Sequence, residues 1–254
     1  MEISNKKSIY ENAKEYDHKY GSYVEDYELI QEWANRTKGR ILDLGCGTGR
    51  ILFRLVDEGK IVDGVDLSKE MLELAKQKAE MYVVKPNFYC MNLTDLQLEK
   101  AYSMMYMVGN TFQHILTNSQ QDEMLIKVYE HLSTGGIFIF DTRMTKLDEL
   151  KEIDRYTEEY INHNQQKVIE HHYEQYDLIS QILECTIQKE VYDNELNQLL
   201  TTTQEYIHIK YTFPQELLRM LHQHGFEVLH QYGGWNCQSL ESKSNSIITI
   251  CRKC

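Results

Sequence analysis

A glycine-rich turn carries the clearest chemical signal in the sequence. The chain reads Asp-Leu-Gly-Cys-Gly-Thr-Gly over residues 43–49, after an apolar run and before an amphipathic stretch. A strand that enters such a turn and leaves it as a helix places backbone without side chains beneath a flat ligand, close to free helix amides. A dinucleotide fingerprint would need glycine at the position of Arg50, and a phosphate loop would need a Gly-Lys-Ser or Gly-Lys-Thr ending. Neither is present, so the turn predicts a nucleotide-like ligand of another kind.

Two carboxylates near the turn narrow the choice of ligand. Asp66 ends the next apolar run, where a carboxylate can accept hydrogen bonds from both ribose hydroxyls and tolerates no phosphate on them. Asp43 adds a negative charge that suits a ligand with a cationic amino group and a sulfonium better than a pyrophosphate. Further along, Asn92 can accept from an adenine amino group while the Leu93 amide donates to a ring nitrogen. Together these groups predict S-adenosylmethionine as the cofactor.

One histidine lies where a reaction base would be useful. Methyl transfer from a sulfonium is an in-line displacement, so a protein mainly aligns the acceptor with the methyl group and removes a proton where necessary. His114 follows the fourth predicted strand, at the carboxyl edge where ligands of such sheets bind. An ordinary histidine pKa of about 6.5 suits proton removal near neutrality. The alternative is a histidine that begins the next helix and bonds to the backbone, and the sequence favours neither interpretation.

The pattern between Gly39 and Asp141 predicts the scaffold for these residues. Short apolar runs alternate there with amphipathic stretches, which is typical of βα units and a mainly parallel sheet. Strands are predicted at 40–44, 61–66, 87–91, 103–108 and 136–140, and helices at 48–57, 68–80 and 119–132. Ser68 is an expected N-cap, and residues 133–136 are expected to end the third helix at a C-cap. The predicted fold class is α/β, with a doubly wound, mainly parallel, Rossmann-like sheet.

The segments that flank this core differ from it in composition and in the spacing of their apolar residues. Residues 10–33 are polar and rich in tyrosine, and their spacing predicts a helix over the sheet edge. Residues 157–211 alternate with period two, which predicts an antiparallel β meander, and a final helix and two antiparallel edge strands complete the sheet. We therefore predict an N-terminal helical cap at 1–38, a cofactor-binding α/β domain at 39–150 and 213–254, and an antiparallel β insert at 151–212.

The insert has the composition of a substrate lid. It carries tyrosines at 156, 160, 173, 176, 192, 206 and 211 and histidines at 163, 171, 172 and 208. Adjacent residues on a strand point to opposite faces, so His171 and His172 cannot easily chelate one ion together, and no metal site is predicted. After the insert, residues 232–235 read Tyr-Gly-Gly-Trp and could either add an aromatic wall to a substrate cavity or fill the loop before the last strand.

The core resembles the class I S-adenosylmethionine-dependent methyltransferase family. The resemblance rests on the blocks Ile41 to Arg50, Gly64 to Leu72, Asn110 to Thr117 and His131 to Gly136. It implies that the glycine turn cradles the methionine end of the cofactor, that Asp66 holds the ribose, and that Leu67 and Met71 line the adenosine pocket. Asn92 departs from the family pattern, which usually has Asp there. Because Asn keeps an acceptor but lacks the charge, we expect weaker adenine contacts.

A weaker similarity concerns the segment Tyr-Asp-His-Lys-Tyr-Gly at 16–21. It resembles the sugar N-methyltransferases of antibiotic biosynthesis, in which a histidine at the place of His114 and a tyrosine of this segment lie near the amine. The similarity implies that Tyr16 or Tyr20 closes over the methyl group or bonds the methionine carboxylate; alternatively, both tyrosines anchor a helix against the core. The candidate catalytic residues are thus His114, Tyr16 and Tyr20, and the candidate cofactor contacts are Tyr20, Asp43, Gly45, Cys46, Gly47, Asp66, Leu67, Met71, Asn92, Leu93 and Met107.

Composition limits the partners. The chain has 27 Lys and Arg against 39 Asp and Glu, and a net charge of -12 repels phosphate backbones and anionic lipid. No apolar run approaches the ~18 residues of a membrane span, and the N-terminus lacks the apolar core of a signal peptide. We expect a cytoplasmic monomer or homodimer that methylates nitrogen or oxygen of a small molecule, with no nucleic-acid or membrane partner. The alternatives are a nicotinamide-dependent oxidoreductase, disfavoured by Arg50, and a non-catalytic module that binds S-adenosylmethionine.

Overall fold

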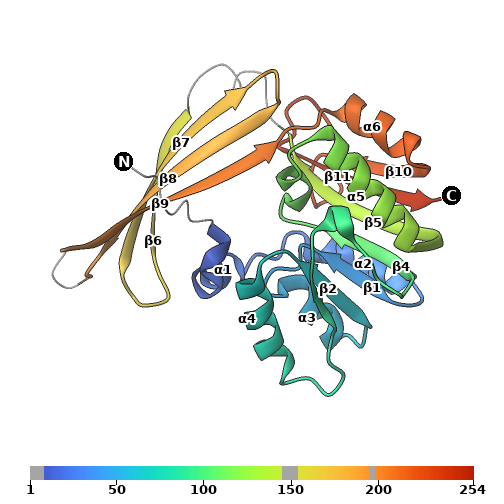
Figure 1. The fold of residues 1–254 in the computed structure, drawn as a ribbon, viewed down its shortest axis with the longest axis horizontal. Coiled ribbons are helices and arrows are strands. Elements are labelled where there is room, and N and C mark those ends of the chain that lie inside the picture. Colours follow the sequence, from blue (N-terminus) through green and yellow to red (C-terminus); the bar gives the residue numbers. More distant parts are fainter. Residues whose placement is uncertain (1–8, 145–153, 195–197) are drawn as a thin grey trace.

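Two β-sheets organise the protein (Figure 1). The computed structural model describes residues 9–144, 154–194 and 198–254. The helices are α1 Ala13–Tyr20, α2 Tyr27–Arg36, α3 Arg50–Asp57, α4 Lys69–Ala79, α5 Asn118–His131 and α6 Pro214–Gln223, with short 3-10 helices η1 Ile9–Glu11, η2 Leu93–Asp95 and η3 Thr111–His114. The strands are β1 Ile41–Leu44, β2 Val62–Asp66, β3 Phe88–Cys90, β4 Tyr102–Met107, β5 Leu132–Arg143, β6 Asp154–Ile161, β7 Lys167–Asp177, β8 Ile182–Tyr192, β9 Leu199–Lys210, β10 Phe226–Tyr232 and β11 Ser246–Lys253.

The larger sheet has the predicted doubly wound form. Its strand order is β10-β11-β5-β4-β1-β2-β3, in which β1 to β5 are parallel and β11 pairs antiparallel with both β5 and β10. One hydrophobic cluster packs α2, α3 and α4 on one face of the sheet, and a second packs α5 and α6 on the other. The predicted fold class is confirmed. Because β1, β2 and β4 are parallel, their carboxyl ends meet at one edge.

Local chemistry explains where the core helices begin. The Ser68 hydroxyl accepts from the Met71 amide at 3.2 Å, so the expected N-cap of α4 is confirmed. Met71, Leu72 and Ala75 then recur at helical spacing and are all buried against the sheet. Pro214 occupies the first turn of α6, where its missing amide hydrogen costs no hydrogen bond.

The insert forms the smaller sheet, with the order β6-β7-β8-β9 and antiparallel pairing throughout. Leu183, Cys185 and Ile187 alternate along β8 and are buried, as period-two alternation predicts, whereas Val191 near the end of the strand is only partly buried. In Figure 1 this sheet lies beside the α/β domain, with α1 between the two. The boundary predicted between residues 150 and 151 lies outside the described residues.

Two predictions of local structure were wrong. The single helix expected over residues 10–33 is instead α1 and α2, because α1 ends at Tyr20 with Gly21 as its C-cap and α2 begins only at Tyr27. The expected C-cap at 133–136 is a bulge within β5, where the pairing with β4 jumps from Leu132 to Ile137 and Gly135 takes a φ of +73°. Among the described helices, none has both the length and the apolar character that crossing a bilayer requires.

Candidate active site

A cavity of about 570 Å³ opens at the carboxyl ends of β1, β2 and β4. Its walls come from the α/β domain and from the N-terminal segment that includes α1. All but one of the predicted site residues line it: Tyr16, Tyr20, Asp43, Gly45, Cys46, Gly47, Asp66, Leu67, Met71, Asn92, Leu93 and His114. The structure therefore brings together side chains that are up to 98 positions apart in the sequence. A volume of this size is within the range of small-molecule sites.

Met107 is the exception. Its side chain is fully buried in the cluster that packs α5 and α6, whereas the next two residues of the chain, Val108 and Gly109, line the cavity. Side chains alternate across a strand, so the last residue of β4 points into the helix layer and the cavity begins one residue later. The structure thus does not bring Met107 to the site.

The glycine turn needs glycine for different reasons at each position. Gly45, Gly47 and Gly49 all have positive φ, at 75°, 53° and 85°. A Cβ on Gly45 would lie 2.5 Å from Thr111 Cγ2, and one on Gly49 would lie 2.5 Å from Phe53 Cε2. A Cβ on Gly47 would meet no protein atom within 4 Å. Only Gly47 therefore faces open space, which is the cavity it lines.

Gly47→Ala tests whether a ligand uses that space. The methyl group would fill room at the cavity wall, and we expect the dissociation constant for S-adenosylhomocysteine to rise by roughly tenfold or more. Gly59→Ala is the matched control, since Gly59 has a φ of +79°, an equally open Cβ position and no place in the cavity lining. Both variants should lose roughly 1 kcal/mol of unfolding free energy to the positive φ. Equal cofactor affinity in the two proteins, measured by calorimetry, would contradict this account of the turn.

Asp66 links the turn to the second βα unit. Its Oδ2 accepts from the Gly47 amide at 2.8 Å and its Oδ1 accepts from the Ser68 amide at 2.8 Å. Burial raises the pKa of this carboxyl, and the backbone hydrogen bonds oppose the rise. Each oxygen keeps further lone-pair capacity on the cavity wall, so the carboxylate can still accept from two hydroxyls of a ligand.

Asp43 presents an unsatisfied acceptor at the base of the cavity. The side chain is 2% exposed, and the Tyr106 hydroxyl donates to Oδ2 at 2.8 Å. Oδ1 is buried and accepts no hydrogen bond. Burial raises the pKa of the carboxyl to about 7, against the Tyr106 hydrogen bond and the charge of Arg50. A buried carboxylate oxygen of this kind fits a ligand that brings a positive charge to the glycine turn.

Arg50, which distinguishes the turn from a dinucleotide fingerprint, has a structural partner. It donates to both carboxylate oxygens of the buried Asp26, at 2.7 and 2.5 Å, just before α2. This two-bond pair fixes the start of α3 against the N-terminal segment.

The other end of the cavity is apolar and suits an adenine ring. Leu67 is 69% exposed and Met71 is buried, and both line the cavity, so a flat ligand would cover the exposed leucine. Asn92 caps η2 by accepting from the Thr94 amide at 3.1 Å. Its carboxamide therefore already has one role in the fold, and a contact with adenine stays a prediction. Together with the orphaned oxygen of Asp43, these walls fit S-adenosylmethionine.

A row of rings closes the cavity on the N-terminal side. The Tyr10 ring lies 5.5 Å from the His114 ring and 5.6 Å from that of Tyr16, whose ring is 4.8 Å from that of Tyr20. Burial raises the pKa of Tyr10 well above its ordinary range and that of Tyr16 to about 12. Both phenols therefore stay protonated and act as donors near neutral pH.

His114 is held between the Tyr10 hydroxyl and the backbone of β9. Its Nε2 lies 2.7 Å from the Tyr10 hydroxyl, which as a neutral phenol can donate to it. Burial lowers the pKa of the imidazole. A hydrogen bond with the backbone of His208 on β9 raises that pKa in part, as expected where a ring N–H donates to a carbonyl oxygen. Nδ1 is then the donor and Nε2 the acceptor of a neutral ring. The residue ends η3, so it does not begin the next helix.

Several residues of the site were missed by sequence reasoning. Tyr10 lies in a polar stretch with no motif, and only its place at the start of the tyrosine-rich segment could have indicated it. Thr111 faces Gly45 from η3 and lies within a block already noted, so its small size was a readable signal. In contrast, Tyr232 and Trp235 pack with the α2 cluster and fill the loop before β11, rather than lining the described cavity.

Known proteins that are similar to this chain in sequence include methyltransferases. A family model described as a methyltransferase domain matches residues 41–136. A Geobacillus sp. (strain WCH70) protein named as a methyltransferase is 33% identical over 140 residues, which cover 55% of this chain and 56% of that protein. The match to this curated relative thus spans only about half of its length.

Solved structures share the fold over most of the chain. An S-adenosylmethionine-dependent methyltransferase from Clostridium acetobutylicum ATCC 824 has a TM-score of 0.78 at 21% identity, covering 91% of this chain and 92% of that chain. The S-adenosylmethionine-bound amino pentose methyltransferase from Micromonospora echinaspora has a TM-score of 0.73 at 15% identity, covering 100% of both chains. At these identities the likeness concerns the fold. Taken together, these comparisons show that the chain contains a methyltransferase domain with the fold of S-adenosylmethionine-dependent methyltransferases.

Proposed function

We propose that the protein transfers a methyl group from S-adenosylmethionine to a nitrogen of a small, amino-bearing molecule. The observation that carries the proposal is the buried, neutral His114, which presents an acceptor Nε2 beside the cavity at 2.7 Å from Tyr10. A bound cofactor would supply a methyl group on a positively charged sulfur. An amine acceptor needs an uncharged lone pair to attack that methyl group, and so it must lose a proton.

The residues of the chain have distinct roles in this proposal. Asp66 and the glycine turn would hold the cofactor, and Asp43 would face its positive charge. His114 would take the acceptor proton at Nε2 once the acceptor amine displaces the Tyr10 hydroxyl from that nitrogen, which has a single lone pair, while the His208 backbone keeps the ring oriented. Tyr16 and Tyr20 would exclude water from the cavity, which strengthens each of these electrostatic interactions.

The choice of nitrogen rather than oxygen rests on chemistry and on likeness. One solved structure with the same fold is named an amino pentose methyltransferase, which supports a polar amino compound as acceptor. Proton removal by a group of ordinary basicity also suits an ammonium better than an alcohol. The net charge of -12 favours a small cationic acceptor over nucleic acid or anionic lipid. Whether the protein is a monomer or a homodimer stays open.

Two linked measurements test the proposal. Calorimetric titration with S-adenosylhomocysteine should give saturable binding, and NADH in the same cell should not compete. Incubation with methyl-labelled cofactor and a panel of amino sugars, simple amines and phenols should then transfer label to nitrogen. Cofactor binding without transfer to any member would favour the non-catalytic module. Transfer only to phenols would move the proposal to oxygen.

A further inference from the structure

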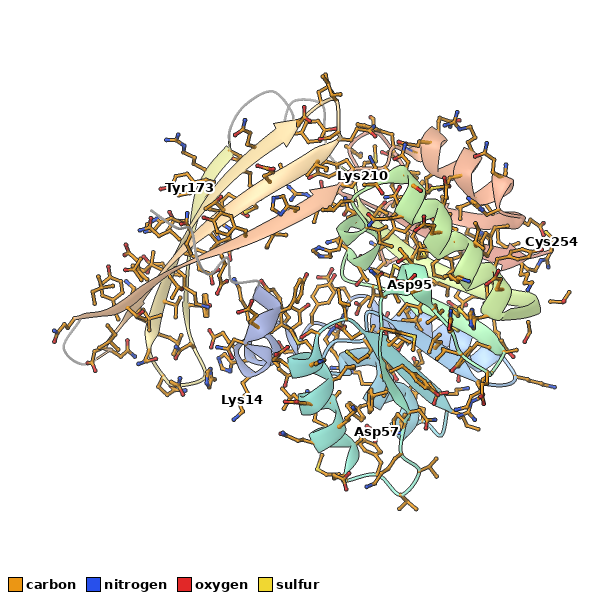
Figure 2. All side chains as sticks on the ribbon, viewed as in Figure 1. Lys14, Asp57, Asp95, Tyr173, Lys210 and Cys254 are labelled. Carbon is orange, nitrogen blue, oxygen red and sulfur yellow. The ribbon has the colours of Figure 1, made fainter. Side chains whose placement is uncertain are left out.

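Helix α1 has two adjacent faces, one of which lines the cavity while the other contacts the insert. Tyr16 and Tyr20, one helical turn apart, point into the cofactor cavity. Glu15 and Lys19, also one turn apart, face the insert sheet and bond to its side chains. Figures 1 and 2 show α1, marked in Figure 2 by Lys14, between the insert and the α/β domain. Any shift of the helix relative to the insert would therefore also move the cavity wall.

Among the described residues, Asp17 makes the side-chain hydrogen bonds that join α1 to the α/β domain. Asp17 Oδ1 accepts from the Thr48 hydroxyl of the glycine turn at 2.5 Å and from the Lys78 ammonium of α4 at 2.7 Å. The Lys78 and Asp17 side chains are 29% and 28% exposed, so water weakens this ion pair. These bonds bring the helix to the turn, but they leave its opposite face to the insert.

The insert holds α1 through a more deeply buried pair. Lys19 Nζ lies 2.8 Å from Glu170 Oε2 on β7 and 3.0 Å from Glu158 Oε2 on β6. The Glu170 side chain is 6% exposed, whereas that of Glu158 is 48% exposed. The Tyr160 hydroxyl donates to the other oxygen of Glu170 at 2.9 Å, and the Tyr160 ring lies 4.8 Å from the ammonium. Glu170 is thus the buried centre of the contact and Glu158 its exposed edge.

Further charges surround this pair on both elements. On the insert, Lys189 lies 3.5 Å from Glu170, and His172 Nε2 lies 3.5 Å from the same carboxylate. On α1, Glu15 accepts from His163 at 2.7 Å and lies 3.8 Å from Lys189. The network therefore crosses from the helix to four parts of the insert: β6, β7, β8 and the turn that contains His163.

Both members of the central pair are charged. Burial alone would raise the pKa of Glu170, but the nearby His172 ring and the hydrogen bond from Lys19 outweigh it and hold that pKa far below its usual range. Burial would likewise lower the pKa of Lys19, and the hydrogen bond to Glu170 raises it instead. Removing one member of such a pair leaves a buried charge uncompensated, which is strongly unfavourable.

A metal ion is the other occupant that this cluster suggests. Ligand atoms of Glu158, Glu170 and His172 lie within 4.8 Å of one another. The Lys19 ammonium, however, already lies at hydrogen-bond distance from both carboxylates. It supplies the positive charge that a cation would bring, so the cluster works as a contact between helix and insert.

We propose that Lys19 and Glu170 are positioning residues that hold α1 closed over the cofactor, so that the insert controls how long the cofactor stays bound. The inference rests on the proposed function for its consequence, but the contact itself can be tested without ligand. It predicts that the pair acts on cofactor affinity through Tyr16 and Tyr20, and acts little on the chemical step once the cofactor is bound.

Glu170→Gln tests the pair, with Glu158→Gln as the matched control. Glu170→Gln leaves the ammonium of Lys19 without its buried partner, and we expect the dissociation constant and the KM for the cofactor to rise by roughly tenfold or more. At saturating cofactor, kcat should change by less than about twofold, because His114 is untouched. Glu158→Gln removes only the exposed partner and should change either constant by less than about threefold. The double variant K19M/E170Q should bind cofactor no more weakly than Glu170→Gln alone.

Hydrogen exchange in the ligand-free proteins separates this inference from the proposed function. The amides of residues 16–21 should exchange faster in Glu170→Gln than in the wild type or in Glu158→Gln, with unchanged exchange in β1 and β4. Unchanged exchange in α1 would overturn the inference, as would a loss of kcat with unaltered KM. If the wild-type protein fails to bind S-adenosylhomocysteine, the proposed function fails, while the exchange result still decides whether the pair holds α1.

Discussion

Asp66→Ala is expected to weaken binding of S-adenosylhomocysteine by roughly a hundredfold, because two charge-assisted hydrogen bonds to ribose hydroxyls are worth about 3 kcal/mol together. At saturating cofactor, turnover should stay close to that of the wild type, since we expect the carboxylate to contact the ribose rather than the acceptor. Calorimetry gives the dissociation constant, and initial rates at high cofactor concentration give kcat. The variant should therefore separate binding from chemistry.

The carboxylate also serves the fold, which requires a control. Asp66 accepts from the Gly47 and Ser68 amides, so its removal frees two backbone donors near the cavity. Asp66→Asn keeps the size and one acceptor, and should bind with intermediate affinity. An S-adenosylhomocysteine analogue without the 2′-hydroxyl should bind the wild type more weakly, yet lose nothing further in Asp66→Ala. If the analogue and the mutation act additively, the carboxylate does not contact that hydroxyl.

The part of the fold that could be predicted from the sequence is the part set by local rules. The strand boundaries from residue 40 to 108 agree with the structure to within one residue at most ends, because apolar runs, an N-cap at Ser68 and a glycine turn act over a few positions. The same locality made the cofactor predictable. Asp43 lies near the end of β1 and Asp66 ends β2. Because these strands are parallel, the two side chains lie at the same edge of the sheet.

What could not be predicted depends on contacts between distant segments. Tyr10 reaches His114 across 104 positions, and no spacing in the sequence encodes that pairing. The break between α1 and α2 follows from two different neighbours, since α1 packs against the cavity and the insert while α2 packs on the sheet. The strand that contains Met107 was predicted, but the side chain was expected in the cavity. It points to the opposite face of β4, because side chains alternate along a strand.

The insert shows the same limit at a larger scale. Its antiparallel pattern was readable from period-two alternation, and its four strands are present. The charges that bind it to α1 were not readable, because Glu170 and Lys189 look in sequence like ordinary solvated strand residues. Lys19 and Glu170 are 151 positions apart, so no local pattern connects them. Binding of the acceptor beneath the insert stays a prediction, as the described cavity is lined by the α/β domain and the N-terminal segment.

His114→Ala is expected to lower kcat by roughly a hundredfold or more while leaving cofactor affinity within about threefold of the wild type. The reason is geometric, because the neutral His114 ring presents Nε2 as an acceptor at the cavity wall, 2.7 Å from the Tyr10 hydroxyl. Tyr10→Phe removes the hydroxyl that orients the ring but keeps the base, so its loss should be smaller, about tenfold. A collapse of cofactor affinity in His114→Ala would instead mark a structural histidine.

The pH profile supplies an independent check on the same residue. Burial lowers the pKa of His114, so the neutral, proton-accepting ring is the dominant form at pH 7 and above. With an amine acceptor in excess, kcat should therefore be flat through neutrality and fall on the acid side only below the ordinary histidine value of about 6.5. The acid limb should vanish in His114→Ala and persist in Tyr10→Phe. A wild-type limb above pH 7 would instead point to ionisation of the acceptor or of Asp43, whose pKa is raised to about 7, as the step that limits turnover.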